Sequence, residues 1–211
     1  MGKIALLFPG QGSQYIGMGL DFYNSSEIVK NIFNNFHEII GKNIAKICFE
    51  GPEEDLKQTI NTQPAILAVS IAAYTLLKKK FNIIPDFVAG HSLGEYSALY
   101  AAEVLNLEDV IKLVSKRAEL MSQTQSGSMS AILGLDDEKL NELINQSSEF
   151  GIITIANYNT PDQTVISGES KAVEAANEIA SKLGAKRVVP LPVSGAFHSP
   201  LMESARIELA A

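Results

Sequence analysis

The stretch that decides the fold is GHSLGEYSAL, residues 90–99. A glycine costs about 1 kcal/mol in a helix interior, so a Gly-x-Ser-x-Gly pentapeptide favours a turn. It follows the apolar run 87–89 (FVA) and precedes a helix-like segment. In a strand–turn–helix of this kind the serine oxygen is exposed at the carboxyl edge of a parallel sheet. The stretch therefore predicts an α/β fold with Ser92 as a candidate nucleophile; the alternative is an ordinary glycine-rich turn with Ser92 as helix N-cap.

An oxyanion hole next to Ser92 needs two backbone amides. The amide of Leu93 comes at a helix N-terminus, where N–H groups favour negative charge. The best candidate for the second is the loop 9–12 (PGQG), because it follows the first predicted strand and its glycines let the backbone approach a ligand. The same loop does not fit nucleotide binding, since Tyr15 stands where a dinucleotide fingerprint has its third glycine and Met18 where a P-loop has its lysine.

The first 125 residues alternate between strand and helix patterns. Such alternation is typical of a parallel sheet with helical crossovers. The amphipathic spacing of one helix and the proline in the first turn of the next fix their positions. The predicted elements are a buried strand at 3–8, helices at 27–40 and from 63 to 80, a strand at 87–89, and helices at 95–102 and 108–121.

The pattern changes at residues 126–128 (SGS). Strands at 129–135, 152–156, 163–167 and 186–192 alternate with helices at 136–147 and 169–183, and a turn-rich segment, 157–162, joins the central strands. This β-α-β-β-α-β order predicts a ferredoxin-like unit. We expect 126–196 to be a small subdomain inserted into a discontinuous α/β core made of 1–125 and 197–211. The pattern is still helical at Ala211, so we expect this core to be incomplete at its C-terminal end.

Composition excludes several classes of protein. The formal net charge of −7 argues against nucleic acid as a partner, because phosphate binding needs a basic surface. No apolar run approaches the roughly 18 residues of a membrane helix, and the start lacks a secretory pattern. A single cysteine, Cys48, excludes an intrachain disulfide and a multi-cysteine zinc site. We expect a soluble cytoplasmic protein with no metal, and a monomer.

A serine nucleophile needs a general base, and histidine is the usual one. His37 lies in an amphipathic helix beside Glu38 and is expected to be a surface residue. His91 is adjacent to Ser92, and neighbours at a sharp turn point in different directions. By elimination His198, in a loop just before a helix, is the predicted base. The acids between Ser92 and His198 read as helix-terminal or turn residues, so none stands out as the third member of a triad.

Arg117 is the most informative charged residue. It falls on the apolar stripe of helix 108–121 with Val114 and Met121, whereas Lys112 and Lys116 fall on the outer face. A buried charge is very costly unless it is paired. Two interpretations remain open: a structural ion pair with an internal acid, and a bidentate seat for a substrate carboxylate.

With Ser92, Arg117 and His198 in place, the chain closely resembles the malonyl-CoA:acyl carrier protein transacylases of fatty-acid synthesis. The matching segments cover nearly the whole chain in the family's order: LLFPGQGSQ (6–14), GHSLGEYSAL (90–99), KRAELM (116–121), ANYNTPDQTVISG (156–168) and GAFHSPLM (195–202). The resemblance implies an α/β-hydrolase-like core with a ferredoxin-like insert. It also implies a Ser-His dyad, because family members extend beyond this chain's length and hold the histidine there by a backbone carbonyl.

The resemblance implies a role for each candidate residue. Ser92 is the acylated nucleophile, His198 the base and Arg117 the ligand of the malonyl carboxylate. The amides of Gln11 and Leu93 form the oxyanion hole, with Gln11 also contacting substrate. Malonyl would pass from malonyl-CoA to Ser92 and then to the phosphopantetheine thiol of acyl carrier protein, without a cofactor.

Three other functions remain alternatives. One is a polyketide acyltransferase, although the Ala-Phe-His run resembles malonyl-selective relatives and methylmalonyl-selective ones tend to carry Ala-Ser-His. The second is a serine esterase or thioesterase that uses the same Ser-His pair. The third is a non-catalytic module that binds carrier protein. Because the carrier protein is expected to be acidic, we expect a local basic patch, either Lys182, Lys186 and Arg187 or Lys112 and Lys116.

Overall fold

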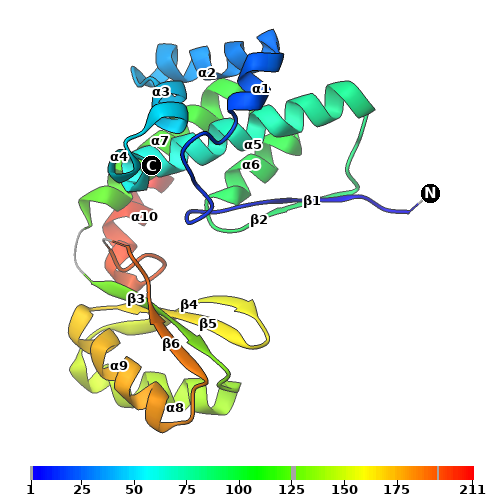
Figure 1. The fold of residues 1–211 in the computed structure, drawn as a ribbon. Coiled ribbons are helices and arrows are strands. Elements are labelled where there is room, and N and C mark those ends of the chain that lie inside the picture. Colours follow the sequence, from blue (N-terminus) through cyan, green and yellow to red (C-terminus); the bar gives the residue numbers. More distant parts are fainter. Residues whose placement is uncertain (1, 125–126, 194) are drawn as a thin grey trace. The chain divides into compact units, whose positions relative to one another are not determined.

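A computed structural model describes residues 2–124, 127–193 and 195–211 (Figure 1). The protein is mixed α/β, with a two-stranded parallel sheet and a four-stranded antiparallel sheet. Residue contacts divide it into two compact units, Met1–Glu119 and Leu120–Ala211. The mixed α/β class is confirmed. The predicted boundary between residues 125 and 126 lies outside the described residues. The grouping by contacts puts 197–211 in the second unit, so the predicted discontinuous core stays a prediction.

The first unit begins with a strand, adds five helices, and closes on a second strand and two more helices. Helices α1, α3 and α4 are short and were not predicted, because none has enough residues to show a helical period. The elements are β1 (Ala5–Phe8), α1 (Leu20–Ser25), α2 (Glu27–Ile40), α3 (Ile44–Glu50), α4 (Glu53–Lys57), α5 (Thr59–Phe81), β2 (Phe87–Gly90), α6 (Gly94–Ala101) and α7 (Leu107–Gln123), whose last turn enters the second unit.

The pairing of β1 with β2 creates the edge that carries the site. The strands are parallel, with Phe8 opposite Gly90 at their carboxyl ends. Asp86 reinforces the opposite end, where its carboxylate accepts a hydrogen bond from the backbone N–H of Ile4 at 2.8 Å. The loop after Phe8 and the turn after Gly90 therefore leave the same edge of the sheet, as the sequence predicted.

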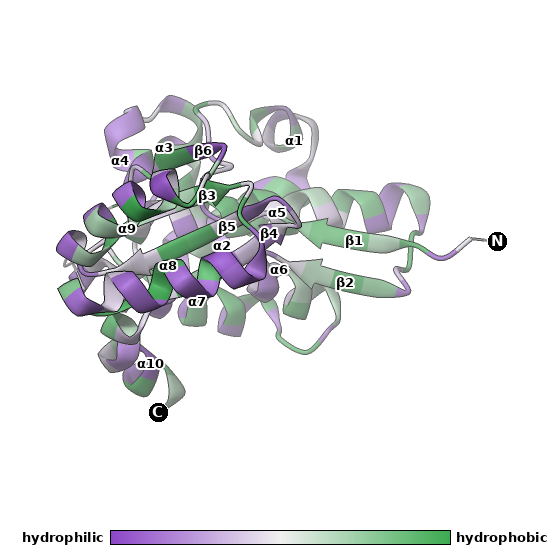
Figure 2. Cartoon of the chain, turned by 90° about the horizontal axis from the view of Figure 1, so that it is seen from below, coloured by the Kyte–Doolittle hydropathy of each residue, from purple (hydrophilic) through white to green (hydrophobic). Residues whose placement is uncertain are grey.

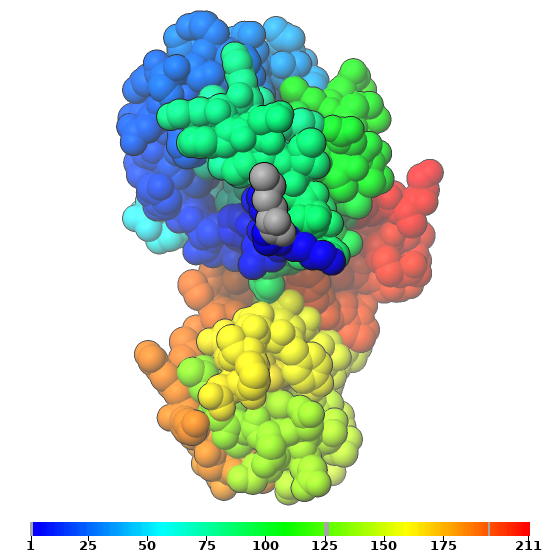
Figure 3. Space-filling view, turned by 90° about the vertical axis from the view of Figure 1, so that its right-hand side faces the viewer, coloured from blue at the N-terminus to red at the C-terminus, as the bar shows by residue number. Residues whose placement is uncertain are grey.

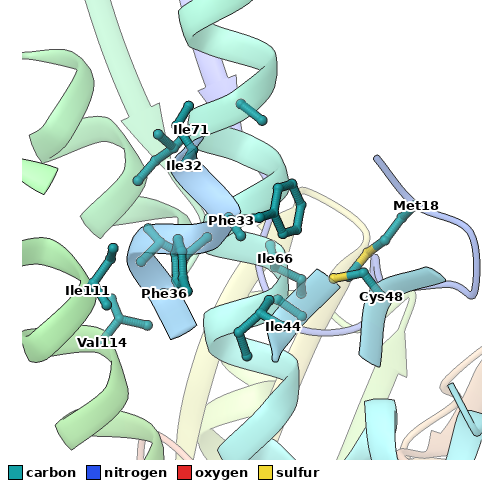
Figure 4. Close-up of a cluster of buried hydrophobic side chains, with 14 of the residues drawn as sticks. Met18, Ile32, Phe33, Phe36, Ile44, Cys48, Ile66, Ile71, Ile111 and Val114 are labelled. Carbon is teal, nitrogen blue, oxygen red and sulfur yellow. The ribbon is translucent and has the colours of Figure 1, made fainter. Parts of the chain in front are cut away.

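The core of the first unit forms around α5. Side chains of α2, α3 and α7 pack on it, with Phe36, Ile71 and Ile111 fully buried (Figure 4). Among the described residues α5 is the one helix with the length and hydropathy of a membrane span, but 61% of the apolar window is buried inside the protein. A helix that is apolar on all sides and covered by its neighbours is a core helix of a globular unit.

Helix α5 begins at Thr59, so the predicted start at Gln63-Pro64 is wrong by four residues. Pro64 lies inside the helix, where it cannot donate the bond that would close on the Ile60 carbonyl. The Lys42 ammonium donates to that carbonyl instead, at 3.2 Å, and to Asn61 Oδ1 at 3.0 Å. A lysine from the α2–α3 connection thus supplies the missing donor and allows the helix to start one turn earlier.

Strand β1 is not the buried strand that its sequence predicts. Leu7 is 79% exposed and Phe87 on β2 is 56% exposed, because in the described chain no third strand pairs with this sheet. The apolar residues of both strands are green in Figure 2. A groove of about 800 Å³ lies beside β1, lined by apolar side chains of α1 and α5 such as Phe22 and Leu77. Figure 3 shows this side of the first unit, with β1 and α1 in blue and α5 in blue-green.

The second unit has the predicted β-α-β-β-α-β order. Its strands form one antiparallel sheet in the order β4-β5-β3-β6. Ile132 of β3 packs with α8 and α9, whereas its neighbours Met129 and Ala131 pack on the opposite face with Phe197. The elements are β3 (Ser128–Leu133), α8 (Asp137–Ser147), the 3₁₀ turn η1 (Ser148–Phe150), β4 (Ile153–Thr160), β5 (Gln163–Gly168), α9 (Ser170–Lys182), β6 (Arg187–Pro190), η2 (Pro200–Met202) and α10 (Glu203–Ala210).

One predicted turn is a strand in the structure. Residues 157–160 continue β4, and only Pro161 and Asp162 turn the chain. Asn157 pairs with Val165 and Tyr158 with Thr164 after a register shift, the mark of a β-bulge. The bulge lets a polar segment remain hydrogen-bonded to β5 although its residue types favour a loop.

Candidate active site

Ser92 stands at a sharp turn between β2 and α6. Its φ is 49°, in the left-handed region that residues other than glycine rarely adopt. The turn is fixed by backbone bonds: the N–H of His91 donates to the Phe8 carbonyl at 3.0 Å, and the N–H of Gly94 donates to the His91 carbonyl at 2.9 Å. Strained backbone of this kind persists where the surroundings over-determine it, which is typical of functional sites.

The two glycines of the pentapeptide are required by close approach. A Cβ on Gly90 would lie 1.9 Å from the Gly94 carbonyl carbon, and a Cβ on Gly94 would lie 2.1 Å from the Phe8 carbonyl oxygen. Helix α6 can therefore start against β1 and β2 only where both positions lack side chains. The alternative of an ordinary N-cap is wrong, because the N-cap residue of α6 is Leu93 and no side chain caps the helix.

Two backbone amides at this edge make no hydrogen bond among the described residues. Within the described residues, neither the N–H of Leu93 nor that of Gln11 donates a hydrogen bond. Leu93 follows the serine, and Gln11 follows Gly10, where a Cβ would lie 2.5 Å from the His91 carbonyl oxygen. The Gln11 side chain is tied back, with its amide donating to Thr59 Oγ1 at 3.2 Å. The loop and the turn are thus in direct contact, as an oxyanion hole shared between them would require.

Arg117 reaches the nucleophile from α7. It is 8% exposed, which confirms the predicted inward face. Its Nη2 donates to Ser92 Oγ at 3.0 Å and its Nη1 to Gln63 Oε1 at 2.6 Å. Burial lowers the pKa of Arg117, and Tyr96 and Glu95 act in the opposite direction. An arginine pKa lies so far above neutrality that the guanidinium keeps its charge.

The Arg117 charge has no carboxylate partner among the residues that the structure describes, where it forms no salt bridge. Five N–H groups belong to a guanidinium. Two donate to Gln63 and Ser92, and Tyr96 accounts for at most one more. At least two remain for an external acceptor. Of the two open interpretations, the structural ion pair is not formed within the described part of the chain, and the arrangement suits a bidentate anion.

Gln63 and Tyr96 are site residues that sequence reasoning missed. Gln63 is 1% exposed and holds one side of the guanidinium, and the Tyr96 ring lies with its centroid 5.4 Å from the guanidinium carbon. The available signal was a single glutamine in the apolar run of α5, since a buried amide must find a partner. Nothing in the sequence, however, says that the partner is an arginine 54 positions away.

His198 lies in the second unit, between β6 and η2. Its φ of 58° is also left-handed, and its neighbours Phe197 and Ser199 are buried while His198 itself is exposed. Ser199 Oγ donates to the Ala196 carbonyl at 2.7 Å and accepts from the N–H of Leu201 at 3.2 Å, which fixes the backbone beside the histidine. The contact of His198 with Ser92, in the first unit, stays a prediction.

The other titratable candidates lie where the sequence places them. His37 is exposed on α2, as predicted. The backbone N–H and carbonyl of His91 both form hydrogen bonds within the turn. Asp136 caps α8 and accepts from the N–H of Lys139, and Asp162 lies in the β4–β5 turn. In the described ranges no three His, Cys, Asp or Glu side chains could hold a metal ion together.

Comparison with known proteins gives consistent matches. The chain matches the family described as "Acyl transferase domain" over residues 5–211. Malonyl CoA-acyl carrier protein transacylase of Bacillus subtilis is 47% identical over 213 residues, covering 99% of this chain and 67% of the relative. The protein of the same name from Staphylococcus aureus (strain MSSA476) is 46% identical over 207 residues, covering 96% and 66%. The chain thus spans about two thirds of the length of these relatives.

Solved structures show the same similarity. An acyl carrier protein S-malonyltransferase from Vibrio cholerae superposes with a TM-score of 0.94 at 42% identity, covering 99% of this chain and 69% of the other. A malonyl-transacylase in complex with a type II polyketide acyl-carrier protein superposes with a TM-score of 0.95 at 39% identity, with the same coverage.

Proposed function

This chain belongs to the acyl transferase domain family, and we propose that it transfers malonyl from malonyl-CoA to the phosphopantetheine thiol of acyl carrier protein in fatty-acid synthesis. The curated relatives are malonyl CoA-acyl carrier protein transacylases by name. The observation that carries the proposal is the buried Arg117 guanidinium, which contacts Ser92 Oγ and keeps N–H groups for an anion.

The distance between these two groups supports malonyl as the acyl group. Only one methylene separates the thioester carbonyl of malonyl-CoA from its carboxylate. When Ser92 Oγ attacks that carbonyl, the carboxylate must therefore lie within a few ångströms of the serine. Arg117 is 3.0 Å from Ser92 Oγ, so one side chain can bind the carboxylate while its neighbour attacks.

The proposed reaction runs in two half-reactions at one serine. His198 takes the hydroxyl proton, Ser92 Oγ bonds to the malonyl carbonyl carbon, and the C–S bond to CoA breaks. The thiolate leaves as CoA with a proton from His198. The carrier protein's thiol then gives its proton to His198, its sulfur bonds to the malonyl carbonyl carbon, and the C–O bond to Ser92 breaks as Ser92 Oγ takes the proton from His198. The amides of Gln11 and Leu93 stabilise the oxyanion in both steps, with about 3 kcal/mol for each donor.

Further parts of the proposal concern architecture and partners. We assign the first unit to an α/β-hydrolase-like core and the sheet of the second unit to a ferredoxin-like subdomain, with 126–196 inserted between 1–125 and 197–211. The proposed protein is cytoplasmic and monomeric, uses no cofactor or metal, and binds malonyl-CoA and acyl carrier protein.

Two alternatives have distinct signatures. The similarity to a malonyl-transacylase bound to a type II polyketide carrier protein favours a polyketide pathway as the second candidate. Transfer rates to a fatty-acid carrier protein and to a polyketide carrier protein separate the two. An esterase would release free malonate from malonyl-Ser92 faster than it transfers malonyl to a thiol.

The test is covalent labelling. Radiolabelled malonyl-CoA is mixed with the chain, alone and joined to the C-terminal third of a relative, and labelled Ser92 is located by peptide mass spectrometry. We expect label on Ser92, its transfer to added carrier protein, and none in Ser92→Ala. Label that is absent from both forms of the protein, or that sits on another residue, would refute the proposed nucleophile.

A further inference from the structure

The bond between Arg117 and Ser92 has a consequence for the nucleophile. The Nη2 group donates to Ser92 Oγ at 3.0 Å in the substrate-free protein. A serine attacks through an oxygen lone pair, and here a cation holds Oγ as an acceptor. Hydrogen bonds from ionised donors are about twice as strong as neutral ones. The bond therefore draws electron density from Oγ and fixes the direction in which its lone pair points.

The guanidinium is held in this position from its other side. Gln63 Oε1 accepts from Nη1 at 2.6 Å, and the Tyr96 ring lies over the guanidinium with its centroid 5.4 Å away. Gln63 and Arg117 are both almost fully buried, so water does not compete for these bonds. Because Gln63 is neutral, it orients the cation without balancing its charge. The anchored guanidinium stays available to a stronger acceptor than a hydroxyl.

We propose that Arg117 restrains Ser92 until the carboxylate of the acyl group takes over the guanidinium, so that only an anionic acyl group releases its own nucleophile. A carboxylate accepts N–H bonds more strongly than a serine hydroxyl does. When the malonyl carboxylate binds the remaining N–H groups, it draws the guanidinium toward itself, and the Nη2 bond to Oγ is lost while the thioester carbonyl is in place. Acetyl carries no anion, so Ser92 stays restrained.

This inference rests on the proposed function and adds a second source of selectivity. A carboxylate seat alone discriminates by binding malonyl more tightly than acetyl. The restraint also makes bound acetyl-CoA slow to acylate, at any concentration. Selectivity would then be found in the rate of the chemical step as well as in substrate affinity.

The test supplies the acyl group and the anion separately. The protein at its natural length is mixed with saturating acetyl-CoA, and acetylation of Ser92 is followed by rapid quenching and intact mass. Ser92 Oγ bonds to the acetyl carbon, the C–S bond breaks, and the serine proton leaves with CoA as thiol. Sodium formate is added as the separate anion and is not consumed. Sodium chloride at equal ionic strength is the control.

We expect formate to raise the acetylation rate about tenfold over chloride, the factor for exchanging a hydrogen bond to a charged group. Bulky pivalate, which cannot enter a buried site, should give no gain. No gain from formate, or an equal gain from pivalate, overturns the proposal. Both comparisons use unmodified protein, so they do not depend on the folding of a variant.

Two variants assign the effect to Arg117. In Arg117→Gln the rate with acetyl-CoA should rise without formate, and the formate gain should vanish. Arg206→Ala removes an exposed arginine paired with Glu203 in α10 and should keep the full gain. A formate gain that survives in Arg117→Gln overturns the inference. If unmodified protein forms malonyl-Ser92 yet shows no formate effect, only the restraint is wrong; if it forms no malonyl-Ser92, the proposed function is wrong.

Discussion

Replacing Gln63 by glutamate tests the carboxylate seat without enlarging any side chain. Gln63 Oε1 is 2.6 Å from Arg117 Nη1, in a position that is 1% exposed. The substitution Gln63→Glu keeps the shape and turns the neutral acceptor into a carboxylate beside a cation that has no carboxylate partner in the described residues. Because the new charge is paired, the free energy of unfolding should be maintained or raised.

Malonyl transfer should fall sharply in the same variant. A malonyl carboxylate on the remaining N–H groups of Arg117 would share one guanidinium with the introduced carboxylate, which puts the two charges roughly 5 Å apart. At an effective dielectric constant of about 20, two like charges at that distance repel by about 3 kcal/mol. This corresponds to a loss of about two orders of magnitude in kcat/KM for malonyl-CoA. Acetyl-CoA, which brings no second carboxylate, should lose much less.

The assay pairs kinetics with stability. Acylation of Ser92 by malonyl-CoA and acetyl-CoA is measured beside urea unfolding for unmodified protein, Gln63→Glu and Gln63→Leu. Gln63→Leu leaves a buried N–H of Arg117 without its acceptor, so it should lose about 1.5–3 kcal/mol of stability. A Gln63→Glu variant that transfers malonyl at the unmodified rate would refute Arg117 as the carboxylate seat. A Gln63→Glu variant that unfolds more easily than Gln63→Leu would refute the pairing.

Three further outcomes follow from the first unit. Gly94→Ala should abolish acylation, since its Cβ would lie 2.1 Å from the Phe8 carbonyl oxygen. In the control Gly41→Ala the new Cβ meets no atom within 4 Å, so this variant should only lose about 1–2 kcal/mol of stability for its φ of 69°. Equal acylation by the two variants would contradict this. Phe36→Ala should lose about 3–5 kcal/mol in urea unfolding, because the ring is fully buried. Burial raises the pKa of Cys48 from 9.0 to about 12, so this thiol ionises at lower pH in the unfolded chain than in the folded one. The free energy of unfolding should therefore fall as the pH rises between these values, by at most about 1.4 kcal/mol per pH unit. Cys48→Ala should remove this slope in urea unfolding.

Much of the fold could be predicted because local patterns determine it. The period of α2 and the β-α-β-β-α-β order of the second unit depend on alternating apolar residues and on turn residues such as Gly184, whose φ is 90°. The start of α5 could not be predicted, because it depends on a bond from Lys42 to Ile60 across the chain. The exposure of Leu7 is also a tertiary property, since it depends on which strands pair with β1.

The candidate site divides in the same way. Ser92 and Leu93 follow from a pentapeptide, and the inward face of Arg117 follows from a helical stripe. Gln63 does not, because a single buried amide shows no period, and its partner is identified only when α5 and α7 pack together. The predicted base, His198, is selected by elimination. Its approach to Ser92, however, involves two units of the chain, and no local sequence pattern encodes that approach.

The left-handed backbone at position 92 limits which atoms evolution can use for attack. Threonine also offers a hydroxyl, but branching at Cβ makes a φ of 49° a severe outlier for it. Cysteine is unbranched and can occupy the same turn. A library randomised at this codon and selected for covalent acylation should therefore return cysteine more often than threonine.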